Sequence, residues 1–330
     1  MQKAEYWHKT PEGKAQCELC PHHCVVAEGK AGLCRVRGVR DGELQALCYG
    51  VVSSAAMDPI EKKPLYHFHP GSQIFSIGGW GCNLACVFCQ NWTISQQVLD
   101  KTAELMPSRV VKEALGHRSV GVAYTYNEPI VGFEFVRDCA RLAKDASLAN
   151  VLVTNGFIER EPARELLPFI HALNIDIKSM DDQFYKEHCR GRLQPVLDFA
   201  KQSVDAGCHV EITNLVIPGL NDKPELFTKL AQWIRANLGQ ATPLHFSAYR
   251  PEHKLTVHAT PPSTLEKAFA LAKSELQYVY LGNVRLAEGS NTACPGCKAV
   301  LVSRRGYLTE IGDIKSGACG ACGRKADMVL

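Results

Sequence analysis

The sequence Gly78-Gly79-Trp80-Gly81-Cys82-Asn83-Leu84-Ala85-Cys86-Val87-Phe88-Cys89-Gln90-Asn91-Trp92 contains a C-x3-C-x2-C run. An apolar segment, residues 74–77, precedes it, so we expect these cysteines on a loop that leaves the end of a strand. Thiolates bind both iron–sulfur clusters and zinc. Three thiolates leave one iron of a four-iron cluster open, whereas structural zinc needs a fourth protein ligand. The spacing alone leaves both interpretations open.

The residues around the cysteines favour the cluster. Gly78, Gly79 and Gly81 let the backbone wrap a bulky cofactor, and the aromatic Phe88 stands between the last two cysteines. The run resembles the C-x3-C-x-aromatic-C motif of the radical S-adenosylmethionine (SAM) superfamily. Residues 58–64 and 89–92 resemble its AmmeMemoRadiSam-system branch, which is related to the pyruvate formate-lyase activating enzymes. The resemblance covers residues 17–286.

The resemblance implies a 4Fe–4S cluster held by Cys82, Cys86 and Cys89. The amino and carboxylate groups of SAM would chelate the fourth iron, and Phe88 would lie beside the adenine. It also implies an external one-electron reductant, flavodoxin- or ferredoxin-like. The electron cleaves SAM, and the resulting 5′-deoxyadenosyl radical removes hydrogen from a substrate.

Composition excludes several other classes of protein. The 330 residues are 46% hydrophobic with a net charge of +3, and Lys and Arg are scattered, so we expect no nucleic-acid partner. No run is long and apolar enough to span a membrane, and the N-terminal residues do not read as a signal peptide. The 15 cysteines are odd in number and mostly closely spaced, which favours metal binding in a reducing cytoplasm over disulfides.

Strands and helices alternate downstream, which predicts βαβ units and a parallel sheet. The expected fold is therefore α/β, a partial or complete TIM-like barrel, and the resemblance implies that it is of the radical SAM type. The predicted strands are 74–77, 119–124, 150–154, 173–177, 209–216, 243–247 and 278–281. The predicted helices are 129–146, 162–171, 193–206, 225–237 and 263–276. Ser263, with Glu266 three positions later, indicates an N-cap for the last helix.

Polar residues follow, end or lie within several of these strands, and barrel enzymes carry their chemistry where loops leave the strand ends. They are Asn127, Glu128, Asn155, Asp176, Lys178 and His245. Together they suit a charged, hydroxyl-rich cofactor. The resemblance implies that Asn127 and Glu128 bind the methionyl ammonium, although Tyr126-Asn127 replaces the family's double glycine. It also implies that Asn155 and His245 lie beside the ribose. The Asp176/Lys178 pair would touch SAM.

Two further cysteine groups flank the barrel and predict small metal modules. The N-terminal group is Cys17, Cys20, Cys24 and Cys34, a four-thiolate site for zinc or an auxiliary iron–sulfur cluster. His22 and His23 are interpreted as solvated neighbours of this site. The C-terminal group is Cys294, Cys297, Cys319 and Cys322, whose C-x2-C-x21-C-x2-C spacing is close to a zinc ribbon.

The predicted domains are therefore 1–57, 58–286 and 287–330. The remaining cysteines are interpreted as small buried hydrophobic residues. They are Cys48, Cys139, Cys189 and Cys208.

The segment 58–71 leads into the cluster strand and is rich in Pro, Lys and His. Lys62, Lys63 and His67 are candidate substrate contacts, and a solvated loop is the alternative. The flanking modules favour a small molecule or a short, partner-delivered segment as substrate. The other functions considered are a glycyl-radical-enzyme activating enzyme and a non-catalytic adaptor that binds several metals or transfers electrons.

Overall fold

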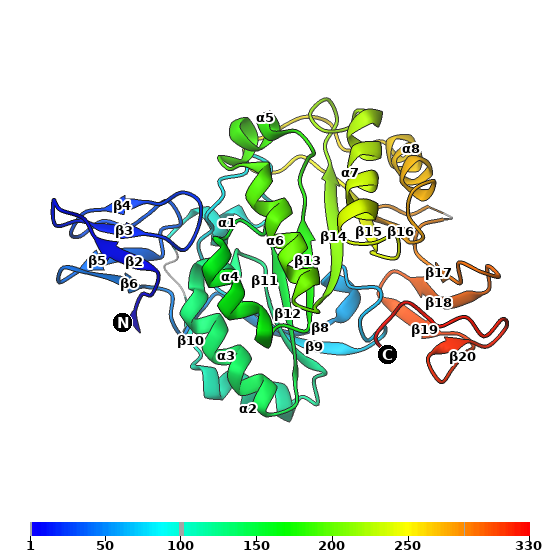
Figure 1. The fold of residues 1–330 in the computed structure, drawn as a ribbon, viewed down its shortest axis with the longest axis horizontal. Coiled ribbons are helices and arrows are strands. Elements are labelled where there is room, and N and C mark those ends of the chain that lie inside the picture. The colour runs from blue at the N-terminus through cyan, green and yellow to red at the C-terminus, as the bar shows by residue number, and fades with distance from the viewer. Residues whose placement is uncertain (1, 99–101, 287) are drawn as a thin grey trace.

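A sheet of eight strands forms the centre of the molecule (Figure 1). The structure is a computed structural model that describes residues 2–98, 102–286 and 288–330. The strand order is β16-β15-β14-β13-β12-β11-β9-β8. The strands are β8 (Ser54–Pro59), β9 (Gln73–Gly78), β11 (Gly121–Thr125), β12 (Ala149–Thr154), β13 (Ala172–Asp176), β14 (His209–Val216), β15 (Leu244–Ala248) and β16 (Val279–Gly282).

Neighbouring strands from β9 to β16 pair in parallel, and β8 pairs antiparallel with β9. Within the described residues the order does not close on itself, so the prediction of a partial barrel is confirmed. All seven predicted strands are present, because each is an apolar, β-rich run buried by its neighbours.

Helices connect the strands and cover the outer face of the sheet, as α3, α4, α6 and α7 do in Figure 1. Bulky residues of the strands, such as Leu173 and Ile212, pack against them in one large core. The α-helices are α1 (Trp92–Gln96), α2 (Pro107–Gly116), α3 (Phe133–Asp145), α4 (Arg160–Leu166), α5 (Asp182–Phe184), α6 (Leu193–Asp205), α7 (Pro224–Asn237) and α8 (Pro262–Lys273). Short 3-10 helices are η1 (Ile60–Lys62), η2 (Pro129–Gly132) and η3 (Leu167–Phe169), and η4 (Tyr185–Cys189) is a π-helix.

The segment between β8 and β9 packs against the inner face of the sheet. Its Ile60, Leu65 and Phe68 form a second apolar cluster with residues of β9, β11, β12 and β13. Ile60 and Leu65 are fully buried. The alternative of a solvated loop at 58–71 is therefore wrong, since this segment contributes to the core.

The N-terminal module consists of two small antiparallel sheets that pack on the barrel beside α3 (Figure 1). One contains β1 (Gln2–Lys3), β6 (Glu43–Ala46) and β5 (Arg37–Arg40), and the other β2 (Trp7–Lys9), β3 (Ala15–Cys17) and β4 (Val25–Val26). A buried ion pair joins the module to α3, with Arg37 Nη1 3.0 Å from Glu134 Oε2. β7 (Val51–Val52) then pairs with β10 (Ala103–Glu104).

The C-terminal module lies at the other end of the molecule (Figure 1). Its strands are β17 (Thr292–Ala293), β18 (Val300–Arg305), β19 (Leu308–Ile311), β20 (Ile314–Lys315) and β21 (Ala318–Cys319). Arg304 of this module is buried, and its guanidinium lies 4.2 Å from the ring centre of Tyr66. The tail also pairs with the β8–β9 segment, because Val329 N donates to His67 O at 2.8 Å.

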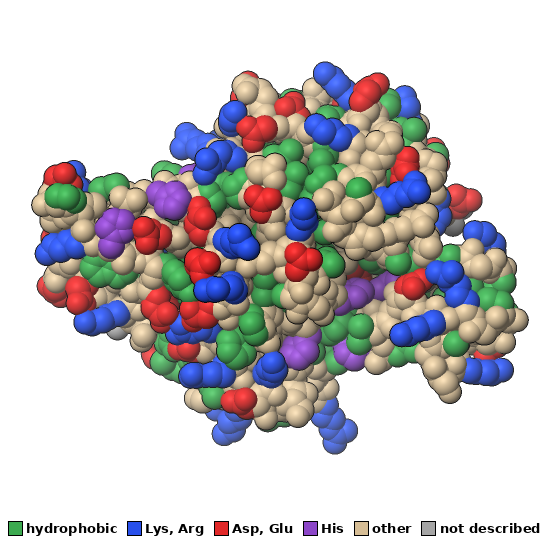
Figure 2. All heavy atoms as spheres, in the orientation of Figure 1, with side chains coloured by type: hydrophobic (Ala, Val, Ile, Leu, Met, Phe, Trp, Pro, Cys, Tyr) green, Lys and Arg blue, Asp and Glu red, His purple; other side chains and the backbone are tan. Residues whose placement is uncertain are grey.

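The surface shows mixed charge. On the face drawn in Figure 2, Lys and Arg alternate with Asp and Glu rather than gathering in one patch. In the described part of the chain, no helix is long and apolar enough to cross a bilayer.

Candidate functional site

The cysteine loop follows β9 at the carboxyl end of the parallel sheet. Gly81 adopts a φ of 83°, a backbone conformation that glycine tolerates best. The side chain of Asn127 braces this turn, because its Oδ1 accepts from Gly79 N at 2.9 Å and its Nδ2 donates to Gly81 O at 3.1 Å. Asn127 therefore supports the loop. Its predicted contact with the methionyl ammonium stays a prediction.

The three thiols fit the donor set that a cluster requires. Cys82, Cys86 and Cys89 are all free, and Cys86 is buried. Burial raises the pKa of Cys82 and Cys89, and such thiols become thiolates when they bind a metal. The three cysteines come from one loop, so a single segment presents them together.

Cys189 contacts this loop, a neighbour that the sequence analysis missed. A hydrogen bond from Cys189 lowers the pKa of Cys86. The backbone joins the same segments, because Ala85 N donates to Cys189 O at 2.8 Å. No spacing pattern links Cys189 to the loop, since about 100 residues separate them in the sequence. Its burial agrees with its interpretation as a small buried residue.

Glu128 and Asn155 lie beside the cysteine loop. The Glu128 carboxylate accepts from Thr154 Oγ1 at 2.7 Å, Asn155 N at 2.7 Å and Ile130 N at 3.1 Å. Burial raises the pKa of Glu128 to about 7 despite these bonds. Asn155 Nδ2 lies 3.6 Å from Cys82 Sγ. Both predicted SAM-binding residues are therefore next to the expected cluster.

Asp176 ends β13 and forms an ion pair at 3.1 Å with Lys178, two residues further along the chain. The Asp176 side chain is 39% exposed, whereas that of Lys178 is only 14% exposed. Burial lowers the pKa of Lys178, but Asp176 and the nearby thiols outweigh this effect and hold it well above its ordinary value. A lysine fixed in its charged form beside an accessible carboxylate suits the carboxylate and hydroxyl groups of SAM.

Aromatic residues pack at two sides of the cysteine loop. Phe88 is buried, and its ring centre lies 5.8 Å from that of Phe184. Trp92 stacks on His253 at 5.1 Å, and Lys254 N donates to Val87 O at 3.0 Å. The segment after β15 thus covers the cysteine loop. The sequence analysis missed this contact because it depends on tertiary packing.

His245 lies inside the barrel within a buried polar network. Its Nε2 is 2.7 Å from Glu211 Oε2, and its ring stacks on Tyr280 at 5.1 Å. Burial raises the pKa of Glu211, but hydrogen bonds from His209 and His245 outweigh it and lower the net value well below the ordinary one. The predicted ribose contact of His245 stays a prediction, since this nitrogen already has a protein partner.

All three candidate substrate residues form ion pairs or hydrogen bonds with other residues of the chain. Lys62 and Lys63 each lie 2.7 Å from a carboxylate oxygen of Asp58, and Lys63 also donates to Tyr126 Oη at 3.1 Å. His67 is fully buried between Asp327 O and Tyr280 Oη, at 2.7 and 2.6 Å. Only Lys62 is substantially exposed, with 43% of its side chain accessible.

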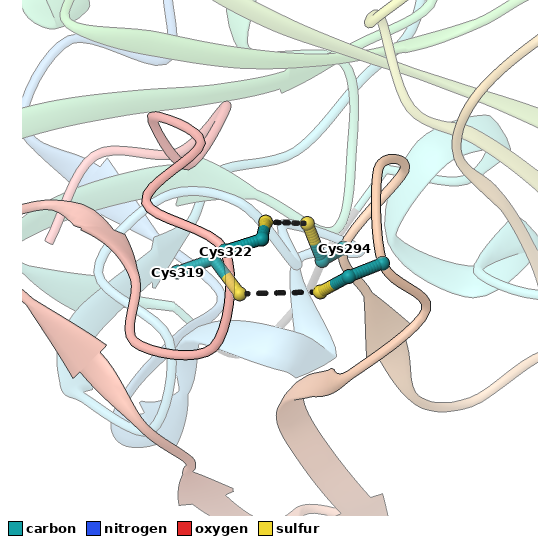
Figure 3. Close-up of side chains that lie close together, drawn as sticks. Cys294, Cys319 and Cys322 are labelled. Carbon is teal, nitrogen blue, oxygen red and sulfur yellow. Dashed lines mark hydrogen bonds between the residues drawn. The ribbon is translucent and has the colours of Figure 1, made fainter.

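The C-terminal cysteines form a compact group (Figure 3). Cys294 and Cys322 lie 3.6 Å apart at sulfur, as do Cys297 and Cys319. All four sulfurs lie within 4.8 Å of one another. A tetrahedral zinc with Zn–S bonds of about 2.3 Å separates its sulfurs by about 3.8 Å, so this group has the dimensions of a zinc site.

The N-terminal cysteines are arranged differently. Cys17, Cys20, Cys24 and Cys34 surround a cavity. His22 donates through Nε2 to Asn83 O at 2.7 Å and is half-buried, so its interpretation as a solvated neighbour is wrong. His23 is exposed, as expected of a solvated neighbour, and lies 2.9 Å from the Glu159 carboxylate.

Comparison with known proteins identifies the family. Residues 77–231 match the profile of the Radical SAM superfamily. The chain is 44% identical to an uncharacterized protein of Methanocaldococcus jannaschii over 336 residues, covering 100% of both chains. It is 29% identical over 187 residues to the pyruvate formate-lyase 1-activating enzyme of Escherichia coli K12, covering 54% of this chain and 73% of the relative.

Among solved structures, a radical SAM methyltransferase from Sphaerobacter thermophilus superposes with a TM-score of 0.50 at 15% identity. The match covers 65% of this chain and 67% of that one, and it shows similarity of fold alone. The matched family profile begins in β9, immediately before the three-cysteine loop. This chain belongs to the radical SAM superfamily.

Proposed function

We propose that this chain is an enzyme that cleaves SAM reductively at a 4Fe–4S cluster and removes hydrogen from a substrate. The observation that carries the proposal is the position of the three free thiols. Cys82, Cys86 and Cys89 follow β9 at the same edge of the sheet where Glu128 follows β11 and Asp176 ends β13. When bound, the cluster and SAM supply the electron transfer that generates a 5′-deoxyadenosyl radical.

The chain's own residues bind and orient SAM in this proposal. Lys178, held charged by Asp176, binds a carboxylate, and the partly exposed carboxylate of Asp176 accepts from ribose hydroxyls. Glu128 Oε2 accepts one bond, from Asn155 N, which leaves it capacity for an ammonium. Phe88 and the segment around His253 exclude water from the loop.

The substrate is proposed to contact a cluster of polar side chains formed by Asp58, Lys62, Lys63 and Tyr126. Lys63 is 1% exposed and contacts both Asp58 and Tyr126, so it fixes the shape of this group. Lys62 is the accessible member. His67 lies deeper and positions the segment. A small molecule or a short segment delivered by a partner fits an interior that the β8–β9 segment already partly fills.

Activation of a glycyl radical enzyme is the second candidate. Its support is the 29% identity to the E. coli activating enzyme. Mixing the reduced protein and SAM with a glycyl radical enzyme tests it. A glycyl radical signal in electron paramagnetic resonance (EPR) spectra would establish this function in place of small-molecule chemistry.

The proposed function is tested by anaerobic assay. Protein reduced by flavodoxin should convert SAM to 5′-deoxyadenosine and methionine, measured by mass spectrometry. Cys82→Ala, Cys86→Ala and Cys89→Ala should each abolish the products. Cys139→Ala, a buried cysteine on α3, should keep them. A non-catalytic adaptor would yield no cleavage in any variant, including the wild type.

A further inference from the structure

The N-terminal module contains a cavity that the proposed chemistry does not use. Arg37 of β5 and Asn83 of the catalytic loop share its lining with the four cysteines. The lining sulfurs belong to Cys17, Cys20, Cys24 and Cys34.

The spacing of these cysteines differs from that of the zinc-like C-terminal group. Among the residues the structure describes, the C-terminal four are the only group of cysteine, histidine or acidic ligands that lie within 4.8 Å of one another. No three of the N-terminal cysteines come that close. A single zinc ion holds the sulfur atoms of its four thiolates about 3.8 Å from one another, as follows from a Zn–S bond of about 2.3 Å. A four-iron cluster binds each thiolate to a different iron and keeps them farther apart.

The buried guanidinium of Arg37 is a second, independent observation on what the cavity binds. It is 2% exposed, and its Nη1 donates to both oxygens of Glu134 at 3.0 Å. Its Nη2 donates to Glu5 O. Its Nε has no partner among the described residues, although the side chain lines the cavity. A buried, unsatisfied N–H group beside four thiols suits an anionic, sulfur-rich occupant.

The cavity adjoins the catalytic loop directly. A Cβ atom on Gly81 would lie 2.5 Å from Cys34 O, so the two segments are in backbone contact. His22, from the knuckle between Cys20 and Cys24, donates to Asn83 O at 2.7 Å. Asn83 follows Cys82 and His22 lies between Cys20 and Cys24, so this hydrogen bond joins the two segments that carry the cysteine groups. Cys20 and Cys24 are partly exposed, which gives the cavity a side toward solvent.

We propose that the N-terminal cysteines hold a second 4Fe–4S cluster that relays one electron to the catalytic cluster. A flavodoxin- or ferredoxin-type donor loses one electron to the second cluster, which then returns to its oxidised state by reducing the catalytic cluster. No bond forms or breaks. Four cysteines occupy all four irons, so this cluster has no open iron for a substrate. The relay rests on the proposed function, whereas the metal assignment does not.

The metal assignment is tested in a Cys82→Ala/Cys86→Ala/Cys89→Ala variant, which lacks the catalytic ligands. Anaerobic preparations should contain about four irons and about four acid-labile sulfides per chain, with a Mössbauer spectrum typical of a 4Fe–4S cluster. Zinc should be about one per chain, at the C-terminal site. No iron with about two zincs would overturn the assignment, as would no iron with about one zinc, which would mean an empty N-terminal site.

A complementary variant separates the two cluster sites. Cys17→Ser/Cys34→Ser should lose about four irons yet keep a cluster whose EPR signal changes when SAM is added. Cys48→Ala is the control, because Cys48 is buried in the same apolar cluster as Cys34 and is not a proposed ligand. Unchanged iron in the serine variant would overturn the second cluster. Loss of the SAM response alone would instead count against the proposed function.

Rapid-freeze EPR tests the relay. In Cys17→Ser/Cys34→Ser, reduced flavodoxin should fail to reduce the catalytic cluster on the timescale at which it reduces Cys48→Ala. Dithionite, a small reductant, should reduce the catalytic cluster in both proteins and so shows that this cluster is intact. Equal rates of reduction by flavodoxin would overturn the relay and leave the metal assignment standing.

Discussion

Gly81 is the residue at which the N-terminal module meets the catalytic loop. Its φ of 83° disfavours any residue with a side chain, and an added Cβ would lie 2.5 Å from Cys34 O and 2.7 Å from Val36 Cγ1. Both the turn that presents Cys82 and the packing of the module therefore require glycine here. The sequence suggested only that glycines let the loop wrap a cofactor, because the Cys34 contact depends on the tertiary fold.

We expect Gly81→Ala to lower the iron content and to destabilise the protein by about 1–3 kcal/mol, the typical cost of a strained backbone site. Gly116→Ala is the control, since a Cβ there meets nothing within 4 Å. Iron analysis and thermal unfolding under anaerobic conditions provide the measurement. Equal iron content and melting temperature in the two variants would show that the contact is unimportant.

Substitution of Cys189 tests whether this residue is a ligand of the cluster. If SAM binds the fourth iron, Cys189 is only a packing neighbour of Cys86, and Cys189→Ala should keep the iron and the EPR change caused by SAM. The expected cost in stability is about 1–2 kcal/mol for a small buried side chain. Loss of the cluster in Cys189→Ala, but not in Cys139→Ala, would instead make Cys189 a fourth ligand.

At the scale of elements, the β8–β9 segment is the feature that the sequence predicted least well. It has no strand or helix periodicity, and its Lys and His residues suggested solvent or substrate contact. In the structure it fills the inner face of the sheet, and buried partners satisfy Lys63 and His67. Those partners, Asp58, Tyr280 and the backbone of Asp327, come from three separate parts of the chain. Local patterns cannot reveal the contacts of His67 with Asp327 and Tyr280, which lie 260 and 213 residues further along the chain.

His67 makes this packing sensitive to pH. Burial lowers its pKa to about 4, from an ordinary value of 6.5. The unfolded chain therefore binds more protons between about pH 4 and 6.5, so stability is lost as the pH falls through this window. At pH 5 the free energy of unfolding should be about 2 kcal/mol lower than at pH 7, because it falls by about 1.4 kcal/mol per pH unit below 6.5.

Thermal unfolding of the wild type and His67→Gln at several pH values measures this effect. The difference between the two proteins should shrink on acidification, because glutamine at this position has no proton to gain. A constant difference between the wild type and His67→Gln from pH 7 to pH 5 would mean that His67 binds no extra proton on unfolding.

The regular elements were predictable because burial on both faces of a parallel sheet imposes continuous apolar runs. β14 spans His209–Val216, the same bounds as predicted. The start of α8 was predicted incorrectly. Pro261 is its N-cap and Pro262 its first residue, so Ser263 makes no cap. Proline at the first helical position has its φ already set and lacks an N–H group that needs a partner, which moved the start one residue earlier.

At the scale of the whole molecule, two modules flank the barrel and both reach buried parts of it. Arg37 pairs with Glu134 of α3, and Arg304 packs on Tyr66 beside Glu61. Motifs and strand ends in the sequence predicted the three cysteine groups and the candidate SAM contacts, and the SAM contacts stay predictions. The sequence could not show that the N-terminal knuckle contacts the catalytic loop, because that contact joins residues far apart in the chain.

The C-terminal module should depend on zinc. Cys294→Ser/Cys319→Ser should lower zinc by about one per chain and lower the melting temperature, because metal binding supplies much of the folding energy of so small a unit. The EPR spectrum of the catalytic cluster should survive. Cys208→Ala, outside the three cysteine groups, is the control. A wild type that holds extra iron and no zinc would contradict the zinc assignment.

The central claim is that SAM binds the open iron of a cluster held by three cysteines. The most direct measurement is electron–nuclear double resonance of the reduced Cys17→Ser/Cys34→Ser protein with SAM labelled by ¹⁷O in its carboxylate. The account predicts a hyperfine coupling between the ¹⁷O nuclei and the cluster. That coupling should be absent when unlabelled SAM is used, and no cluster signal should remain after Cys86→Ala is added. An intact reduced cluster that binds SAM without any ¹⁷O coupling would contradict the account.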